Sequence, residues 1–277
     1  MTDFTDQQFD QWRQAIGRRQ VRNQYLDTES AKRFAVAVGL EPESIPALVH
    51  WAWFLEAAPD QKLGPDGHPK RGEFLPAITL PRRMFASSRI QFHQPLALQH
   101  HAEISIEMID LFRKSGSQGE LLFAKVERAI RQDGALCNEE TQTIVYRDIG
   151  EAVALPVEND IAAQEDDEVW TPDTRNLFRF SSVTFNSHRI HYDQRYAKDV
   201  EGYPDLIVHG PFTAAKLADF ASRRGVLASF EFRGLAPLFQ GQRIVLRRAG
   251  HEVLLITGGR PLAHLDLSDL TVLQLPA

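Results

Sequence analysis

The 277-residue sequence predicts an α+β fold in which both halves combine helices with an antiparallel sheet. Two observations support this class. Segments that alternate in polarity or are rich in β-branched residues follow one another at short intervals, with turn residues between them. In the second half, an apolar helical segment precedes four such segments, an order typical of a helix covered by a meander. With 43% hydrophobic and 25% charged residues, the chain can bury a sizeable core.

The first half of the chain is predicted to begin with helices. They are predicted at residues 4–20, 31–38 and 45–55. Thr5 can serve as the N-cap of the first, whose apolar side chains share one face. The third segment is apolar on nearly all sides, and Pro46 is acceptable in its first turn. We therefore expect the third helix to be buried.

Residues 59–81 form the least regular part of the first half. Turn signals such as Gly64-Pro-Asp-Gly-His68-Pro dominate this segment. A loop of about 20 residues is uncommon in a compact domain unless it covers a site or a partner, so we expect this one to be functional or interfacial. Antiparallel strands joined by hairpins are predicted to follow at residues 90–95, 102–113, 121–132 and 139–147.

The second half begins after an acidic run of low apolar content at residues 158–168, which predicts a linker. The predicted division is residues 1–150, a linker at 151–172, and residues 173–277. A strand is expected at residues 178–184, before a histidine-rich loop and a short segment at 194–200. Gly210-Pro211 then opens a helix over 212–222. The last strands are predicted at residues 226–233, 243–249, 252–258 and 263–275.

Charge and cysteine content exclude several classes of protein. A net charge of −6 argues against a general nucleic-acid binder, which needs an excess of clustered Lys and Arg. Cys137 is the only cysteine and cannot form an internal disulfide, so a reducing compartment fits best. The first ten residues carry three acids and no apolar run, and no segment approaches the roughly 20 apolar residues that span a bilayer. We expect a cytoplasmic protein with no membrane partner.

The strongest indication of chemistry is the run from Asn186 to His191, together with Gly210. It places one amide and two imidazoles, His188 and His191, within six residues. The amide of a glycine at a helix start lies at the positive end of the helix dipole and could polarise a thioester carbonyl. His191 could move a proton, and Asn186 could hold a water molecule.

Other interpretations of this cluster stay open at this stage. The histidines could be solvated, or satisfied by hydrogen bonds within the core. His188, His191 and Asp193 could also bind zinc, although that spacing usually needs a helix or a tight knuckle and a third protein ligand. We predict no metal.

Three arginines, Arg82, Arg83 and Arg89, gather around a segment that we expect to be irregular. Guanidinium groups bind carboxylates and phosphates through paired hydrogen bonds, so these side chains are candidates for an anionic substrate. In a chain with 37 acidic residues they could equally be solvated or form ion pairs.

The sequence resembles a known enzyme family. The run from Ser182 to Asp193 and the run Val208-His-Gly-Pro211 are similar to the hotdog-fold hydratases of the MaoC and (R)-specific enoyl-CoA hydratase group. Within this group, the sequence looks more like the branch that contains itaconyl-CoA hydratase, mesaconyl-C4-CoA hydratase and the mitochondrial 3-hydroxyacyl-thioester dehydratases. The first half matches this branch at residues 63–69, 71–72, 74–76, 80–84, 92–93, 95–96 and 144–147. The resemblance therefore covers nearly the whole chain.

The resemblance implies a double hotdog, two long helices each wrapped by antiparallel sheet. The C-terminal hotdog would be catalytic, and the N-terminal hotdog, with its helical extension, would complete the acyl-CoA groove. The family's usual motif has an aspartate, four residues and a histidine, whereas this chain has Asn186 and His191. His191 would then be the one proton carrier of the pair, Asn186 would orient the water, and the Gly210 amide would hold the thioester oxygen.

The activity implied is that of a hydro-lyase adding water reversibly to a C5 dicarboxyl enoyl-CoA, itaconyl-CoA or mesaconyl-C4-CoA, as in itaconate degradation. The alternatives are a 3-hydroxyacyl-thioester dehydratase acting on monocarboxyl chains and a non-catalytic acyl-CoA-binding protein. No cofactor is expected, because coenzyme A is part of the substrate, and a homodimer is predicted. The candidates for binding a distal carboxylate or the CoA phosphates are His188, Arg189, Arg82, Arg83 and Arg89.

Overall fold

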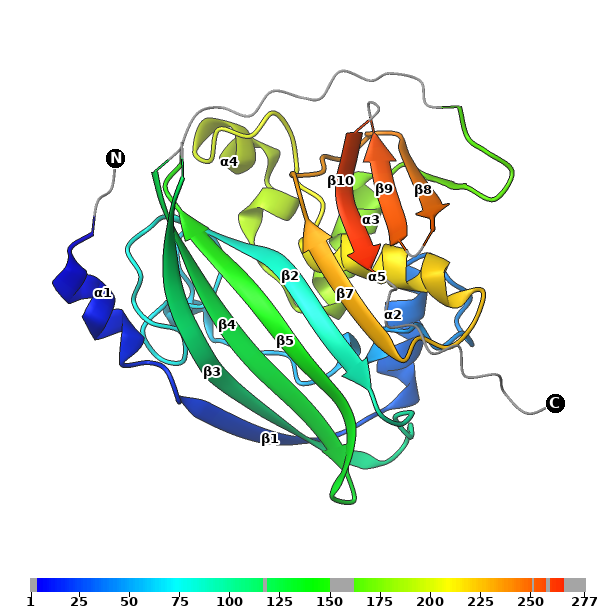
Figure 1. Cartoon of the computed structure of the whole chain (residues 1–277), viewed down its shortest axis with the longest axis horizontal. Helices are drawn as coiled ribbons and strands as arrows, with labels where there is room; N and C mark the ends of the chain where they lie inside the picture. The colour runs from blue at the N-terminus through cyan, green and yellow to red at the C-terminus, as the bar shows by residue number, and fades with distance from the viewer. Residues whose placement is uncertain (1–3, 117–118, 150–161, 251, 258–259, 267–277) are drawn as a thin grey trace.

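The computed structural model describes residues 4–116, 119–149, 162–250, 252–257 and 260–266. At its centre lies one ten-stranded sheet in the order β1-β3-β4-β5-β2-β7-β10-β9-β8-β6. Every neighbouring pair in this order is antiparallel. Figure 1 shows β1 to β5 fanned out in colours from blue to green, and β7 to β10 in orange and red. The predicted α+β class is confirmed.

Strand β2 joins the two groups of strands, because it pairs with β5 on one side and with β7 on the other. The first group consists of β1 (Arg19–Tyr25), β2 (Arg82–Phe92), β3 (His101–Gly116), β4 (Gly119–Gln132) and β5 (Ala135–Arg147). The second consists of β6 (Glu168–Trp170), β7 (Ser229–Gly234), β8 (Ile244–Ala249), β9 (Glu252–Thr257) and β10 (Arg260–Asp266).

The helices are α1 (Asp6–Arg13), α2 (Thr28–Ala37), α3 (Thr174–Val183), α4 (Gln194–Asp199) and α5 (Gly210–Ser222). Short 3-10 turns cover Val49–Ala52, Asp60–Lys62 and Arg189–His191. Helix α5 packs against β2, β7, β9 and β10, and its residues from Phe212 to Ala221 are all buried. Each large apolar side chain buried in this way stabilises the fold by about 1.5–3 kcal/mol. This packing fixes the start of α5 beside strand β2.

The predicted buried helix over residues 45–55 is wrong. The chain forms only the turn Val49–Ala52, and its tryptophans are held by distant partners instead. The Trp51 indole donates a hydrogen bond to Glu140 at 3.0 Å, and the Trp53 indole donates one to Asp27 at 3.3 Å. Burial of these rings is confirmed, but tertiary contacts rather than helix periodicity cause it.

The predicted strand over residues 178–184 is also wrong, because this segment lies in helix α3. Asp173 caps that helix in a reciprocal capping box with Asn176. Leu177, Phe180 and Ser181 are buried, a spacing of three and four residues that places them on one helical face. The cap and this face outweigh the β-propensity of the aromatic and β-branched residues.

Smaller differences concern the edges of elements. The segment carrying Arg82 and Arg89 is part of strand β2 rather than irregular, and the first helix ends at Arg13 instead of residue 20. Strands β1 and β6 were not predicted, and β6 falls inside the expected linker. Residues 151–161 of that linker and 267–275 of the expected last strand lie outside the described residues. The division of the chain into 1–150 and 173–277 stays a prediction.

The long loop over 59–81 is confirmed as irregular apart from one turn.

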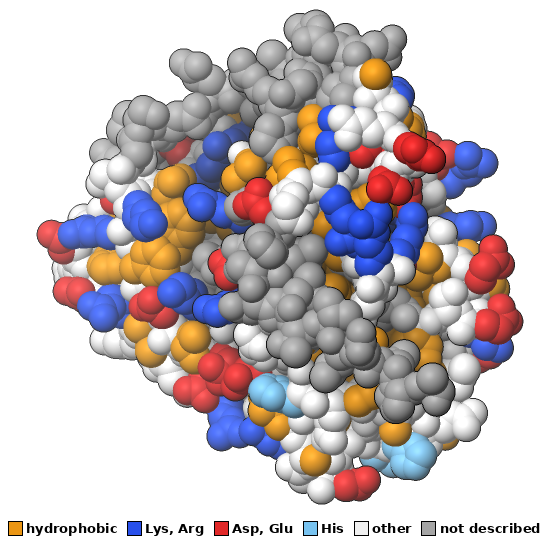
Figure 2. All heavy atoms as spheres, turned by 45° about the vertical axis from the view of Figure 1, so that its right-hand side comes forward, with side chains coloured by type: hydrophobic (Ala, Val, Ile, Leu, Met, Phe, Trp, Pro, Cys, Tyr) orange, Lys and Arg blue, Asp and Glu red, His pale blue; other side chains and the backbone are white. Residues whose placement is uncertain are grey.

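Figure 2 shows one face of the molecule, on which basic and acidic side chains lie next to one another. Ion pairs of this kind include Arg223 with Glu168 and Arg224 with Asp166. In the described part of the chain, no helix has the length and apolar content to cross a membrane.

Candidate active site

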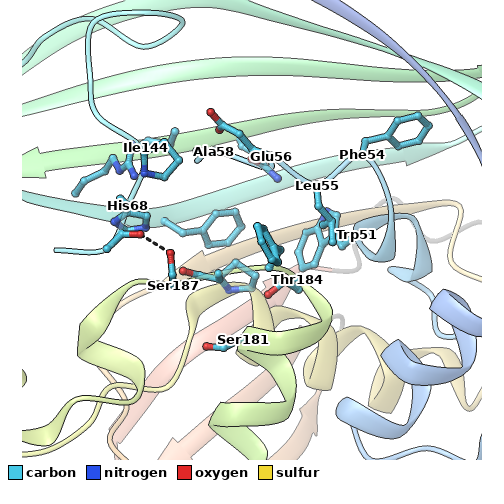
Figure 3. A pocket seen from close by; sticks show the side chains of 18 of the residues that line it. Trp51, Phe54, Leu55, Glu56, Ala58, His68, Ile144, Ser181, Thr184 and Ser187 are labelled. Carbon is cyan, nitrogen blue, oxygen red and sulfur yellow. Dashed lines mark hydrogen bonds between the residues drawn. The ribbon is translucent and has the colours of Figure 1, made fainter. Parts of the chain in front are cut away.

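A cavity of about 720 Å³ lies between the strands of the first group and the segment that follows helix α3. Figure 3 shows His68 and Ser187 toward one end and Trp51 and Phe54 toward the other. The residues that line it come from β1 to β5, the loop over 54–75, helix α3 and the start of α5. Distant parts of the sequence therefore meet around one cavity.

The start of helix α5 forms part of the cavity wall through Pro211. A Cβ atom at Gly210 would come within 3.0 Å of the Phe85 ring and 3.3 Å of the Phe85 carbonyl oxygen on β2. Glycine thus lets the two halves of the fold approach closely here. The first amides of a helix have no intrahelical acceptor and lie at the positive end of its dipole, which makes this end a donor site for an oxyanion.

His191 lies in the turn Arg189–His191 and is buried. Its Nδ1 is 2.7 Å from the carbonyl oxygen of Ile207. Because a carbonyl oxygen can only accept, Nδ1 must carry the hydrogen, and Nε2 of the neutral ring keeps its lone pair. Burial lowers the pKa of His191 to about 3, although the hydrogen bond to Ile207 acts in the opposite direction. The ring is therefore neutral near pH 7 and can accept a proton.

His209 supports His191 from behind. The two rings stack with their centroids 3.6 Å apart, and His209 is completely buried. Its Nε2 lies 2.8 Å from the hydroxyl of Ser181, a residue that lines the cavity. Burial holds the pKa of His209 well below its ordinary value, so the stack contains two neutral imidazoles instead of two repelling cations.

Asn186 lines the cavity, and its side-chain oxygen is already engaged. Its Oδ1 accepts a hydrogen bond from the backbone N–H of His188 at 2.9 Å, an Asx turn. Its own backbone N–H donates to the carbonyl of Ser181 at 2.8 Å. What the side chain offers the cavity is consequently its amide nitrogen, a donor that can hold a water oxygen or a substrate carbonyl but cannot take up a proton.

His188 connects His191 to a group from the first half of the chain. Its ring lies perpendicular to that of His191, with centroids 5.4 Å apart, and 3.9 Å from that of His68. His68 lines the cavity and has Asp66 beside its Nδ1, at 3.4 Å. Burial, and then the charge of Arg83, lower the pKa of His68 to about 4. Burial likewise lowers the pKa of His188.

Asp66, His68 and His188 bring three possible metal-ligand atoms within 4.8 Å of one another. The two imidazoles, however, lie face to face at 3.9 Å with an angle of 36° between their planes. Rings in this arrangement direct their in-plane lone pairs past each other, whereas a tetrahedral ion needs lone pairs that converge on one point. The cluster does not fit such an ion, and the predicted absence of a metal stays a prediction.

The segment from Pro65 to His68 is fastened to the histidine-rich loop by hydrogen bonds. The Ser187 hydroxyl donates to the carbonyl of Gly67. The backbone N–H of Arg189 donates to the backbone carbonyl of Asp66 at 2.8 Å, and the Arg189 guanidinium donates to the backbone carbonyl of Pro65 at 3.1 Å. The loop over 59–81 thus holds the candidate catalytic loop in place, in line with the functional role we expect for it.

Most of the predicted substrate-binding arginines do not line the cavity. Arg82 is buried and donates to the Glu201 side chain and backbone, Arg89 is exposed beside Glu231, and the Arg189 guanidinium pairs with Asp193 at 2.7 Å. Arg83 is the member of this set that reaches the cavity. Successive strand residues point to opposite faces, which explains why Arg82 and Arg83 have different surroundings.

Asn186 and Arg83 line the cavity, and Gly210 precedes Pro211, which also lines it. His188 and His191 are not among the lining residues and are connected to the cavity through the ring contacts with His68. Arg82, Arg89 and Arg189 lie elsewhere. Sequence reasoning missed His68 and His209 as site residues. A signal for His68 was present in the turn-rich Asp66-Gly67-His68 run within a loop too long to be a simple connection.

Comparison with known proteins places this geometry in context. The family described as hydroxyacyl-thioester dehydratase type 2 matches residues 48–240. Mesaconyl-C(4)-CoA hydratase of Chloroflexus aurantiacus is 45% identical over 221 residues, which cover 76% of this chain and 79% of that protein.

Solved structures share the fold. A MaoC-like dehydratase from Phytophthora capsici superposes with a TM-score of 0.65 at 13% identity, over 93% of this chain and 97% of that one. A Mycobacterium tuberculosis protein described as having a double hotdog fold superposes with a TM-score of 0.53 at 12% identity, over 93% and 96% of the two chains. The predicted double hotdog is confirmed.

Proposed function

Since the chain belongs to the hydroxyacyl-thioester dehydratase type 2 family, with a relative that is a CoA hydratase, we propose that it adds water reversibly to a C5 dicarboxyl enoyl-CoA, itaconyl-CoA or mesaconyl-C4-CoA. It is an enzyme of the hydro-lyase class. The name of the Chloroflexus relative supports the dicarboxyl substrate. Coenzyme A would enter as part of the substrate, without a further cofactor.

The observation that carries the proposal is the hydrogen bond from His191 Nδ1 to the Ile207 carbonyl, at 2.7 Å. It fixes a buried neutral imidazole with its Nε2 lone pair unused, close to a helix start that can stabilise an oxyanion. A base next to an oxyanion donor is what addition of water to an α,β-unsaturated thioester requires.

The proposed reaction assigns one task to each of three groups. Asn186 donates its amide N–H to the water oxygen and orients it, and His191 removes a proton as the oxygen adds to the β-carbon. In mesaconyl-C4-CoA and crotonyl-CoA, whose double bond is conjugated with the thioester, the electron pair of that bond moves to the thioester oxygen. There the Gly210 amide stabilises the enolate, and one such donor contributes about 3–4 kcal/mol. The imidazolium then returns its proton to the α-carbon, which completes the addition of one water molecule.

Replacement of His191 and Asn186 tests these roles. With crotonyl-CoA, we expect His191→Ala to lower kcat by about 10³-fold, since general acid–base catalysis contributes about 10²–10⁴. Asn186→Ala should lower it by about 10–100-fold, the effect of losing one positioning hydrogen bond. Loss of enoyl-thioester absorbance in the ultraviolet measures both. A His191→Ala enzyme with normal turnover would refute the assignment.

A second candidate is dehydration of 3-hydroxyacyl thioesters on monocarboxyl chains. The apolar side chains toward one end of the cavity favour it, because Trp51, Phe54 and Leu55 line space there that a longer acyl chain could fill. Turnover of itaconyl-CoA, mesaconyl-C4-CoA, crotonyl-CoA and longer enoyl-CoAs separates the two. A homodimer located in the cytoplasm, without nucleic-acid or membrane partners, stays a prediction.

A further inference from the structure

Arg83 is a cation of the cavity wall that forms no ion pair among the described residues. Arg83 on β2 lines the cavity and is partly buried. In the part of the chain that the structure describes, no carboxylate lies within salt-bridge distance of Arg83, whereas Arg82 and Arg189 pair with Glu201 and Asp193. A partly desolvated guanidinium is unfavourable unless an anion and good hydrogen bonds compensate it. Arg83 therefore marks a place that suits an anion.

The neighbours of Arg83 leave its charge available. Its strand partner is Tyr146, whose pKa is raised by burial and which is therefore a neutral phenol near pH 7. Arg71 also lies nearby, but its guanidinium donates to the backbone carbonyls of Ile78, Leu80 and Pro81. Asp66 and Glu201 are the carboxylates that act on Arg71, and Glu201 is already paired with Arg82. Arg71 and Arg83 therefore outnumber the remaining carboxylate, Asp66, and the charge at this end of the cavity is net positive.

This positive end lies beside the candidate catalytic loop. Arg83 and His68 both line the cavity, and after burial the charge of Arg83 is the next cause that lowers the pKa of His68. His68 contacts His188, and His188 contacts His191, so ring contacts link this part of the cavity wall to the proposed base. When the β-carbon of an enoyl thioester is held at His191, a carboxylate on or next to that carbon would be directed along these rings toward His68 and Arg83.

We propose that Arg83, with His68 beside it, forms a subsite for a carboxylate carried by the acyl group. The subsite rests on the proposed hydratase function and specifies its substrate class. Arg83 supplies paired N–H donors that match a carboxylate, a geometry that lysine cannot reproduce. His68, on the loop fastened to residues 187–189, forms the adjoining wall. The negative charge of a bound carboxylate would favour the protonated ring, whose Nε2 can then donate to it. Selection of a dicarboxyl substrate would thus depend on the first half of the chain.

Binding of two saturated thioesters tests the subsite without any turnover. Succinyl-CoA carries the distal carboxylate, and butyryl-CoA has the same chain length without it. Quenching of Trp51 and Trp53, which line the cavity, provides the signal. The wild-type protein should bind succinyl-CoA at least 10-fold more tightly than butyryl-CoA. Arg83→Gln should abolish this preference and weaken succinyl-CoA binding by about 100-fold, while butyryl-CoA changes less than about threefold.

Arg89→Gln is the matched control, because Arg89 lies on the same strand but is exposed beside Glu231. It should leave both affinities unchanged. Arg83→Lys should restore only part of the preference, and His68→Gln should reduce succinyl-CoA binding by about 10-fold. Equal binding of the two thioesters by the wild type, or an equal loss of both in Arg83→Gln, would overturn the subsite.

Turnover separates failure of the subsite from failure of the hydratase. If the wild type and Arg83→Gln hydrate crotonyl-CoA equally but the variant loses mesaconyl-C4-CoA turnover, both proposals hold. If crotonyl-CoA hydration falls as far as mesaconyl-C4-CoA hydration, Arg83 acts in chemistry or folding and the subsite is wrong. If no enoyl-CoA is hydrated but succinyl-CoA is still preferred through Arg83, the subsite stands and the hydratase proposal fails.

Discussion

Gly67 is the position at which a single methyl group should separate the two loops of the site. Its backbone has φ +86°, a left-handed conformation that favours glycine. A Cβ atom there would lie 1.9 Å from the Ser187 carbonyl oxygen. Since a carbon and an oxygen approach no closer than roughly 3.3 Å, Gly67→Ala requires a separation of about 1.4 Å between the loops.

The cost follows from what that separation breaks. This separation would break the hydrogen bonds from Ser187 to Gly67 and from Arg189 to Asp66. Each lost bond lowers the free energy of unfolding by about 1 kcal/mol. Left-handed strain adds about 1–2 kcal/mol. We expect the free energy of unfolding to fall by about 3–4 kcal/mol. A displacement of about 1 Å at a catalytic group should also lower kcat about 100-fold.

Gly17→Ala provides the control for strain alone. Gly17 also has φ +86°, but a Cβ atom there would meet nothing within 4 Å. This variant should lose only about 1–2 kcal/mol and keep full activity. Urea unfolding and the initial rate with crotonyl-CoA measure both effects. The reasoning is refuted if Gly67→Ala keeps kcat within twofold of the wild type, or is no less stable than Gly17→Ala.

Three further predictions concern the effect of pH and an ion pair between the two halves of the chain. Because burial lowers the pKa of His191 to about 3, kcat/KM for crotonyl-CoA should stay level from about pH 8 to about pH 5; an acid limb near 6.5 would contradict this. His68, His188, His191 and His209 all have lowered pKa values, so they are neutral when folded but take up protons below about pH 6.5 when unfolded. At about 1.4 kcal/mol per group, the free energy of unfolding should fall by about 5.4 kcal/mol per pH unit below that value. Denaturant midpoints at about pH 7 and pH 5.5 measure this loss, and equal midpoints would count against it. Arg82→Gln should cost about 3 kcal/mol of stability by leaving Glu201 without its partner, with an unchanged KM; a raised KM at unchanged stability would instead make Arg82 a substrate-binding residue.

Local sequence patterns predicted those elements whose environment is regular. Strands β3 to β5 alternate because one face of the sheet is buried, and the apolar run after Gly210 became helix α5. Strand β1 escaped prediction because its sequence is almost entirely polar and it pairs only along one edge, with β3. Its strand conformation depends on that neighbour and not on its own pattern.

Helix α3 shows why a short segment can mislead. Phe178, Phe180 and Val183 are typical strand residues, so propensity favoured β structure. The decisive signals were Asp173 and Asn176, three residues apart, which form the capping box. A test for caps before propensity would have corrected the prediction.

Local sequence likewise predicted some residues of the site but not those that depend on contacts between distant segments. Asn186, His191 and Gly210 lie close in sequence on one connected segment, so their association could be inferred from spacing and from family resemblance. His68 joins them through a contact between segments 120 residues apart, from Gly67 to Ser187, and no local pattern contains that information. Arg82 and Arg83 are adjacent in sequence, and only the alternation along strand β2 separates a buried ion pair from a cavity residue.

The most direct test of the central claim follows one reaction with two detectors. Purified protein is mixed with mesaconyl-C4-CoA and with crotonyl-CoA, while enoyl-thioester absorbance and free thiol are recorded together. Hydration predicts loss of absorbance without release of thiol, and His191→Ala should abolish that loss. Release of thiol in step with the absorbance change would identify hydrolysis, and unchanged absorbance with both substrates would contradict the proposed hydratase.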